Sequence, residues 1–192
     1  MDRGDGAVLR ETETPASIPK APAGHELRAR TGWRLREALP GWTASVVGAA
    51  LWALLMAASA FVGLLLEDWQ TDEKIRTIAL LYALGGAIAF APGLFAARFV
   101  SLGRAAEVRF AAAFLSLALA TIGVTALIYA FDYRSYYAEW HAEALSITWA
   151  FQLMFTTLGA LAQFAVLGLR LYFPLGFVAL FLAALWFVRT TR

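Results

Sequence analysis

One stretch decides the fold: ASVVGAALWALLMAASAFVGLLL, residues 44–66. It contains no charged residue, and about 20 apolar residues are enough for a helix to cross the ~30 Å hydrocarbon core of a membrane. Lipid offers the backbone no hydrogen bonds, so such a segment must satisfy its own as a helix. The stretch therefore predicts a transmembrane helix and makes lipid the solvent of the fold.

Four further apolar segments repeat this pattern, at residues 77–97, 110–131, 145–167 and 171–188. Only Gly168, Leu169 and Arg170 separate the last two, so a single bent segment or a re-entrant hairpin is the alternative to two full crossings. We predict an all-α, polytopic membrane helical bundle over residues 43–188. Five transmembrane helices are expected, and four are the alternative.

The composition of the whole chain agrees with this class. Hydrophobic residues make up 60% of the 192 residues and charged residues only 16%, against ~45–50% apolar and ~25% charged in soluble domains. The absence of cysteine excludes disulfides and thiolate chemistry. Arginine outnumbers lysine fourteen to two, a bias typical of GC-rich bacterial genomes, so we expect a bacterial inner membrane.

The N-terminal region divides into two parts. Residues 1–24 are polar and contain three prolines, so a disordered cytoplasmic tail is expected. Residues 25–39 carry four arginines among apolar side chains. This pattern favours an amphipathic interfacial helix whose arginines face anionic lipid headgroups, with a plain basic linker as the alternative. The distribution of Lys and Arg predicts a cytoplasmic N-terminus and, with five crossings, an external C-terminus.

The second apolar segment contains a regular series of small residues. One occurs every four positions: Gly85, Ala89, Gly93 and Ala97. Helices in lipid associate through small residues that let their backbones approach closely, and glycine otherwise weakens a helix interior by ~1 kcal/mol relative to alanine. We therefore predict that this face packs against a neighbouring helix at the centre of the bundle.

Polar residues inside the predicted spans are few, and none is ionisable near a span centre. This absence argues against ion-coupled transport, which places charged groups there. Gln152, Thr156 and Gln163 lie on or near one face of the fourth segment. They are candidates to line a cavity, and the alternative is hydrogen bonding between helices of the bundle.

The segment DYRSYYAEWHAE, residues 132–143, is expected to form an outer loop. Its tyrosine, tryptophan and arginine residues are of types enriched at protein interfaces and at the headgroup level of membranes. A metal or acid–base site is not favoured, because its histidine has no second histidine or nucleophile beside it. The candidate interaction residues are Tyr133, Arg134, Tyr136, Tyr137, Trp140 and His141.

The sequence has no catalytic, cofactor or metal motif and no nucleic-acid-binding pattern. We therefore expect a non-enzymatic accessory or scaffold subunit of a membrane assembly. Its expected partners are the lipid bilayer and another membrane protein. Two alternatives remain open: a carrier or pore for a neutral or apolar small molecule, and a membrane enzyme that uses His141.

Overall fold

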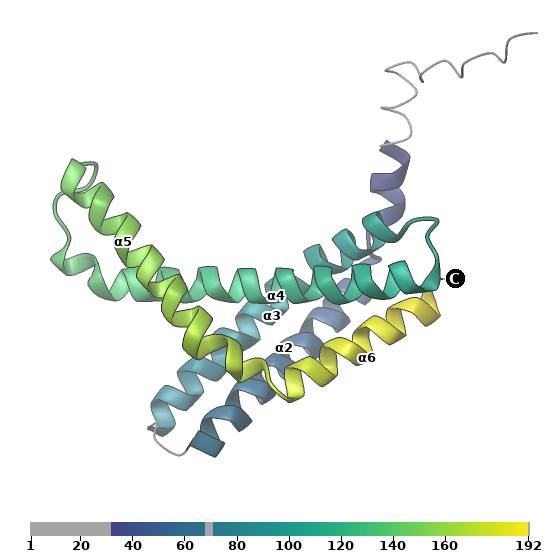
Figure 1. Ribbon diagram of the computed structural model, residues 1–192, viewed down its shortest axis with the longest axis horizontal. Coiled ribbons are helices and arrows are strands. Elements are labelled where there is room, and N and C mark those ends of the chain that lie inside the picture. Colours follow the sequence, from purple (N-terminus) through teal and green to yellow (C-terminus); the bar gives the residue numbers. More distant parts are fainter. Residues whose placement is uncertain (1–31, 68–70, 192) are drawn as a thin grey trace, which may run out of the picture.

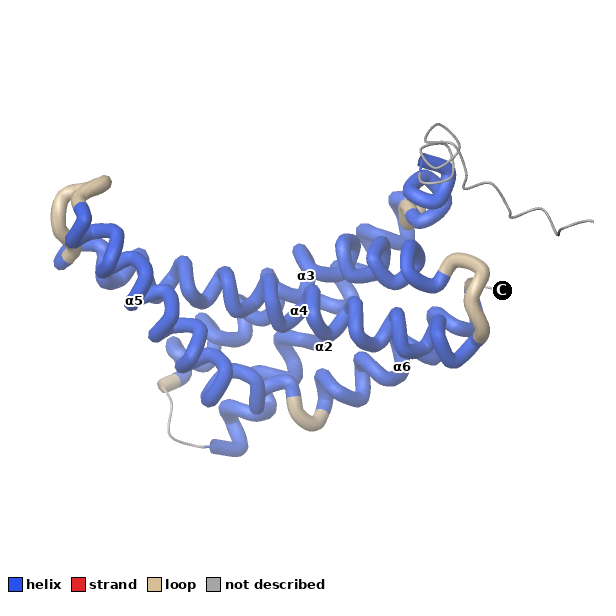
Figure 2. The backbone as a smooth tube through the Cα atoms, turned by 45° about the horizontal axis from the view of Figure 1, so that its top comes forward, coloured by secondary structure: helices blue, strands red, loops and turns tan. Residues whose placement is uncertain are grey.

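The computed structural model describes residues 32–67 and 71–191, and every regular element within them is helical (Figure 2). The predicted all-α helical bundle is confirmed. Its main helices are α2 (Trp42–Glu67), α3 (Asp72–Ser101), α4 (Ala106–Tyr137), α5 (Ile147–Gln163) and α6 (Leu175–Thr190). Each contains the core of one of the five apolar segments, although the segments do not share the exact bounds of the helices.

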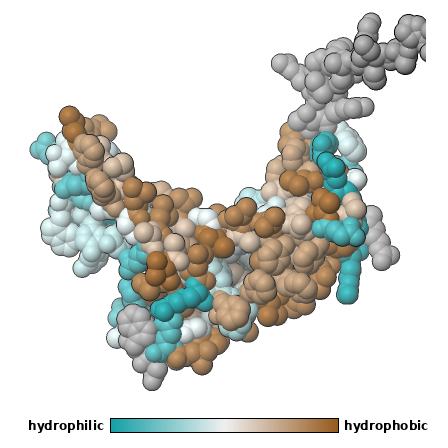
Figure 3. Space-filling model, viewed as in Figure 1, coloured by the Kyte–Doolittle hydropathy of each residue, from teal (hydrophilic) through white to brown (hydrophobic). Residues whose placement is uncertain are grey.

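Within residues 32–67 and 71–191, four helical stretches are long and apolar enough to cross a membrane, which indicates an integral membrane protein. They are Trp42–Glu67, Asp72–Ser101, Ala106–Trp140 and Ile147–Tyr172, and α6 is shorter, with 16 residues. Figure 3 shows apolar surface over much of the bundle, with hydrophilic residues gathered towards its ends. This distribution is the one that a lipid environment requires.

The basic segment before α2 is helical at residues 32–38, whereas residues 1–31, with the expected tail, lie outside the described part of the chain. The Arg34 guanidinium donates to the Phe99 carbonyl (3.4 Å) and lies 5.4 Å from the centre of the Phe99 ring. Arg98 in turn donates to the Leu39 carbonyl (3.2 Å). The segment is therefore attached to the C-terminal end of α3.

The small residues of α3 are buried, and this face lies against α4. A methyl group on Gly85 would overlap the Thr125 hydroxyl and lie 3.0 Å from the Thr125 Cα atom. A methyl group on Gly93 would lie 3.1–3.3 Å from Leu117 and Ala120. The two helices approach this closely only because these positions have no side chain.

Helix α6 runs antiparallel to α4. Phe177 meets Phe114 edge-on with ring centres 5.8 Å apart, and Phe181 meets Phe110 at 5.4 Å. A step of four residues towards the C-terminus of α6 therefore meets a step of four residues towards the N-terminus of α4. At the end of this pairing the Arg109 guanidinium donates to the Thr191 carbonyl.

The described chain therefore begins and ends at the same end of the bundle, as Figure 1 shows. Five full crossings would put the two ends of the described chain at opposite ends of the bundle, so this arrangement favours an even number of crossings over the five expected with an external C-terminus. The physical reason lies in the last two apolar segments. Helix α5 runs obliquely to the other helices (Figure 1). Only α6 then brings the chain back along α4 to the end of the bundle where α4 begins.

The expected outer loop at residue 132 also needs correction, since α4 continues to Tyr137 and a 3₁₀ turn, η1 (Ala138–Trp140), follows. Tyr129, Tyr133 and Tyr137 are spaced by four residues, with successive ring centres 6.3 and 4.8 Å apart. Side chains at this spacing support one another along a helix. The polar residues after Phe131 end the apolar segment, but helix α4 continues through them to Tyr137.

We expect Gly85→Ala to destabilise the protein, because the added methyl group overlaps Thr125. Overpacking of this kind costs about 1–3 kcal/mol. The matched control is Gly123→Ala, also in a spanning helix, where a methyl group meets no atom within 4 Å. That change should be neutral or stabilising by up to about 1 kcal/mol. Unfolding followed by circular dichroism in detergent measures both, and equal stability of the two variants would contradict the close α3–α4 contact.

Candidate functional site

The chain between α5 and α6 is not a regular α-helix. A π-helical turn, η2 (Phe164–Gly168), is followed by a 3₁₀ turn, η3 (Leu169–Tyr172), and then by Phe173 and Pro174. Such a break interrupts the regular hydrogen bonding of the backbone, and each unsatisfied group costs several kcal/mol in hydrocarbon. The break therefore needs hydrogen-bond partners from neighbouring helices.

Two buried side chains supply these partners. The Ser59 hydroxyl of α2 donates to the Leu171 carbonyl (2.8 Å) and accepts from the Gly176 amide (3.0 Å). The Tyr82 hydroxyl of α3 donates to the Gly168 carbonyl (2.6 Å). Ser59 is eight residues from the end of α2, about 12 Å along the axis. The break is thus fixed inside the bundle by α2 and α3.

A second polar contact fixes the tryptophan at the centre of α2. The Trp52 indole N–H donates to the Thr121 hydroxyl (3.0 Å), and the Thr125 hydroxyl donates to the Thr121 carbonyl (2.7 Å). Trp52 also lies beside Phe90, with ring centres 6.1 Å apart. The indole is therefore held in one orientation, and its only polar group is already used.

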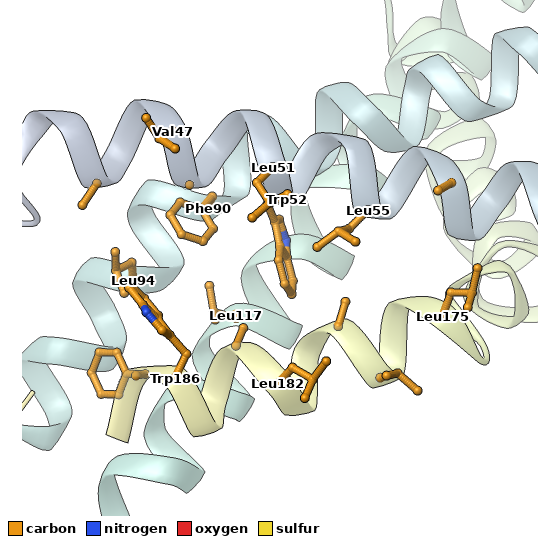
Figure 4. A pocket seen from close by; sticks show the side chains of 17 residues that line it. Val47, Leu51, Trp52, Leu55, Phe90, Leu94, Leu117, Leu175, Leu182 and Trp186 are labelled. Atoms are coloured by element: carbon orange, nitrogen blue, oxygen red, sulfur yellow. The ribbon is translucent and has the colours of Figure 1, made fainter. Parts of the chain in front are cut away.

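An apolar groove of about 620 Å³ opens between α2 and α6. These helices form its two walls, and Phe90, Leu94 and Leu117 of α3 and α4 lie at its base. Figure 4 shows Trp52 reaching from α2 towards α6, and Trp186 reaching from α6 towards Leu94. The volume is in the range of ligand sites, ~300–1,000 Å³.

The groove is suited to an elongated apolar group. It follows α2 from Ala44 to Ala58, about 21 Å of helix. All its lining residues are Ala, Gly, Val, Leu, Phe or Trp, so no titratable side chain faces it. The walls thus favour a hydrocarbon chain and offer no group for acid–base or nucleophilic chemistry.

One end of the groove leads to two arginines. Arg98 follows Leu94 by one helical turn on α3, and Thr191, whose carbonyl binds Arg109, follows Phe187 by one turn on α6. The Nε atoms of both arginines are buried and have no hydrogen-bond partner in the described part of the chain. Arg98 and the Thr191 carbonyl that binds Arg109 therefore lie about one helical turn beyond this end of the groove.

The structure gathers four of the six predicted interaction residues into one aromatic cluster: Tyr133, Tyr136, Tyr137 and Trp140, with neighbouring ring centres 4.8–5.9 Å apart. Arg134 instead lies against α5, its guanidinium 5.8 Å from the centre of the Trp149 ring. His141 follows the cluster, and its backbone N–H donates to the Ala138 carbonyl (3.2 Å).

The three predicted cavity-lining residues make different contacts. The Gln152 side chain accepts from the Ala142 amide (2.8 Å), and the Thr156 hydroxyl donates to the Gln152 carbonyl (2.7 Å). Gln163 lines a different cavity of about 210 Å³, with Tyr82 and Tyr129. Sequence reasoning missed the α2–α6 groove, because its residues are apolar and resemble those that face lipid.

No three His, Asp or Glu side chains lie together as metal ligands within residues 32–67 and 71–191. Comparison of the chain with family models, curated proteins and solved structures gives no match. The groove and the helix break are therefore interpreted from their own geometry.

Ser59→Ala should destabilise the protein, since it leaves the Leu171 carbonyl and the Gly176 amide without their partner. Each unsatisfied buried group costs about 1–3 kcal/mol. The control is Ser45→Ala on the same helix, because the Ser45 hydroxyl bonds only the Gly41 carbonyl one turn back. Thermal unfolding in detergent should separate the two variants, and a loss no larger than that of Ser45→Ala would show that Ser59 does not hold the break.

Proposed function

We propose that this protein is a non-enzymatic, multi-span membrane protein that binds a lipid in the groove between α2 and α6. The apolar groove is the observation that carries the proposal. Its length along α2, its apolar walls and its two tryptophans suit an acyl chain. The alternative expected from the sequence was a carrier or pore for a neutral or apolar small molecule, and the groove supports only the binding of an apolar group.

Charge at the end of the groove favours an anionic phospholipid. Arg98 follows the groove residue Leu94 by one helical turn, and Arg109 binds the carbonyl of Thr191, which follows Phe187 by one turn. Guanidinium groups bind phosphate with strong, charge-assisted hydrogen bonds. In this arrangement the acyl chain occupies the groove and the phosphate lies at the arginines.

The same arginines favour an orientation in the membrane. The end of the bundle that holds both ends of the described chain is also the end of Arg98, Arg104, Arg109 and Arg189. Six of the ten Lys and Arg residues in the described chain fall at this end, and five more precede it in the sequence. By the positive-inside rule we propose that this end is cytoplasmic, in a bacterial inner membrane.

An accessory role in a larger membrane assembly is the second candidate. The observation that favours it is the aromatic cluster at the end of α4, where Tyr136 and Trp140 are 68% and 63% exposed. Exposed aromatic residues are enriched at protein interfaces. The two functions are compatible, because the cluster and the groove lie at different places on the bundle.

Filling the groove should weaken lipid binding. Ala58 is exposed in the groove wall, so Ala58→Phe places a ring where the acyl chain would lie. The matched control is Ala111→Phe, an exposed alanine of α4 that lines none of the described cavities. Native mass spectrometry of protein exchanged into detergent with added phosphatidylglycerol or phosphatidylcholine counts the lipids retained.

The wild-type protein and Ala111→Phe should each retain one phosphatidylglycerol molecule, and Ala58→Phe should bind it about tenfold more weakly. Phosphatidylcholine should be retained less than phosphatidylglycerol. Equal retention by all three proteins, or a membrane protein that copurifies with the wild type and is lost from Ala58→Phe, would overturn the lipid assignment.

A further inference from the structure

Two contacts between side chains of α4 and α5 show how the two helices cross. Trp149, near the start of α5, lies beside Arg134. Phe164, just after its end, lies beside Tyr129, with ring centres 5.9 Å apart. These two contacts are fifteen residues apart on α5 but only five residues apart on α4. Helix α5 therefore crosses α4 steeply.

The contrast with α6 is direct. There the Phe177–Phe114 and Phe181–Phe110 pairs show equal steps on both helices. Figure 1 shows the same difference, since α6 lies roughly along the direction of α2, whereas α5 lies across the direction of α2 and α3. If α2 and α3 cross the membrane, then α5, a helix of 17 residues that lies across their direction, cannot also pass through ~30 Å of hydrocarbon.

Charged residues mark the level at which α5 lies. A cavity at one end of the bundle is lined by Glu67, Lys74, Asp132 and Arg170. Arg170 and Glu67 form an ion pair of 3.0 Å across it. Gln163 at the end of α5 lines the same cavity, so this end of α5 is next to the polar boundary opposite the two ends of the described chain.

The exposed surface of α5 is apolar. Phe151, Phe155 and Leu158 are 57%, 64% and 55% exposed. Gln152 instead bonds the loop before α5, and Ala160 is buried. The outer face of α5 is therefore one that acyl chains can cover, and its polar groups have partners within the protein.

We infer that α5 lies in the plane of the membrane, at the boundary between headgroups and acyl chains on the side opposite the termini. Its outer face binds the acyl chains of that leaflet. Residues 171–188 then make the fourth crossing, between Arg170 and Arg189. The stretch Ile147–Tyr172 has the length and composition of a transmembrane helix. Its direction within the bundle, however, is not that of a helix that crosses the membrane.

Spin-label depth measurements test this inference, and the absence of cysteine makes single-cysteine variants simple to prepare. Nitroxide labels are placed at Phe151, Phe155, Leu158 and Ala162 of α5 in phosphatidylcholine–phosphatidylglycerol vesicles. The control series on α2 uses the exposed positions Val46, Leu54 and Phe61. Relative collision rates with oxygen and with a water-soluble nickel chelate report the depth of each label.

The four α5 labels should lie at one shallow depth, within about one helical turn (~5 Å) of one another. The α2 series should instead pass from shallow to deep along the helix. An α5 series that passes through the membrane centre would overturn the inference, and so would four labels exposed only to water. Neither result depends on whether the α2–α6 groove binds a lipid.

Discussion

The structure depends on one constraint: inside lipid, a break in a helix must find its hydrogen-bond partners within the protein. The chain meets this constraint between α5 and α6. The Ser59 hydroxyl bridges the Leu171 carbonyl and the Gly176 amide, and the Tyr82 hydroxyl binds the Gly168 carbonyl. Because α2 and α3 supply these partners, the chain can change direction at the break without leaving polar backbone exposed to hydrocarbon.

The same break shapes the groove. Ser59 holds the start of α6 next to α2, whereas the phenylalanine pairs hold the body of α6 against α4. Helices α2 and α6 therefore leave a space between them, into which Trp52 and Trp186 extend (Figure 4). The binding site that we propose is thus a consequence of how one helix is attached, and it needs no polar residue along its length.

The sequence was enough to predict the helices but not their directions. Apolar length located all five, since the requirement for a continuous helix in lipid is local. The direction of α5 depends on contacts between distant residues, such as Tyr82 with Gly168, which no local pattern contains. The aromatic residues at 133–140 could be singled out from the sequence by their residue types. The groove could not, because the sequence does not distinguish apolar residues that face a groove from those that face lipid.

The most direct test of this account is the side of the membrane on which each terminus lies. Tags at the two ends of the full chain, probed with a protease in sealed vesicles of known orientation, report it. The account predicts that both tags are cleaved from the same side, because the Thr191 carbonyl binds Arg109 at the end of the bundle where α2 begins. Tags cleaved from opposite sides would contradict it.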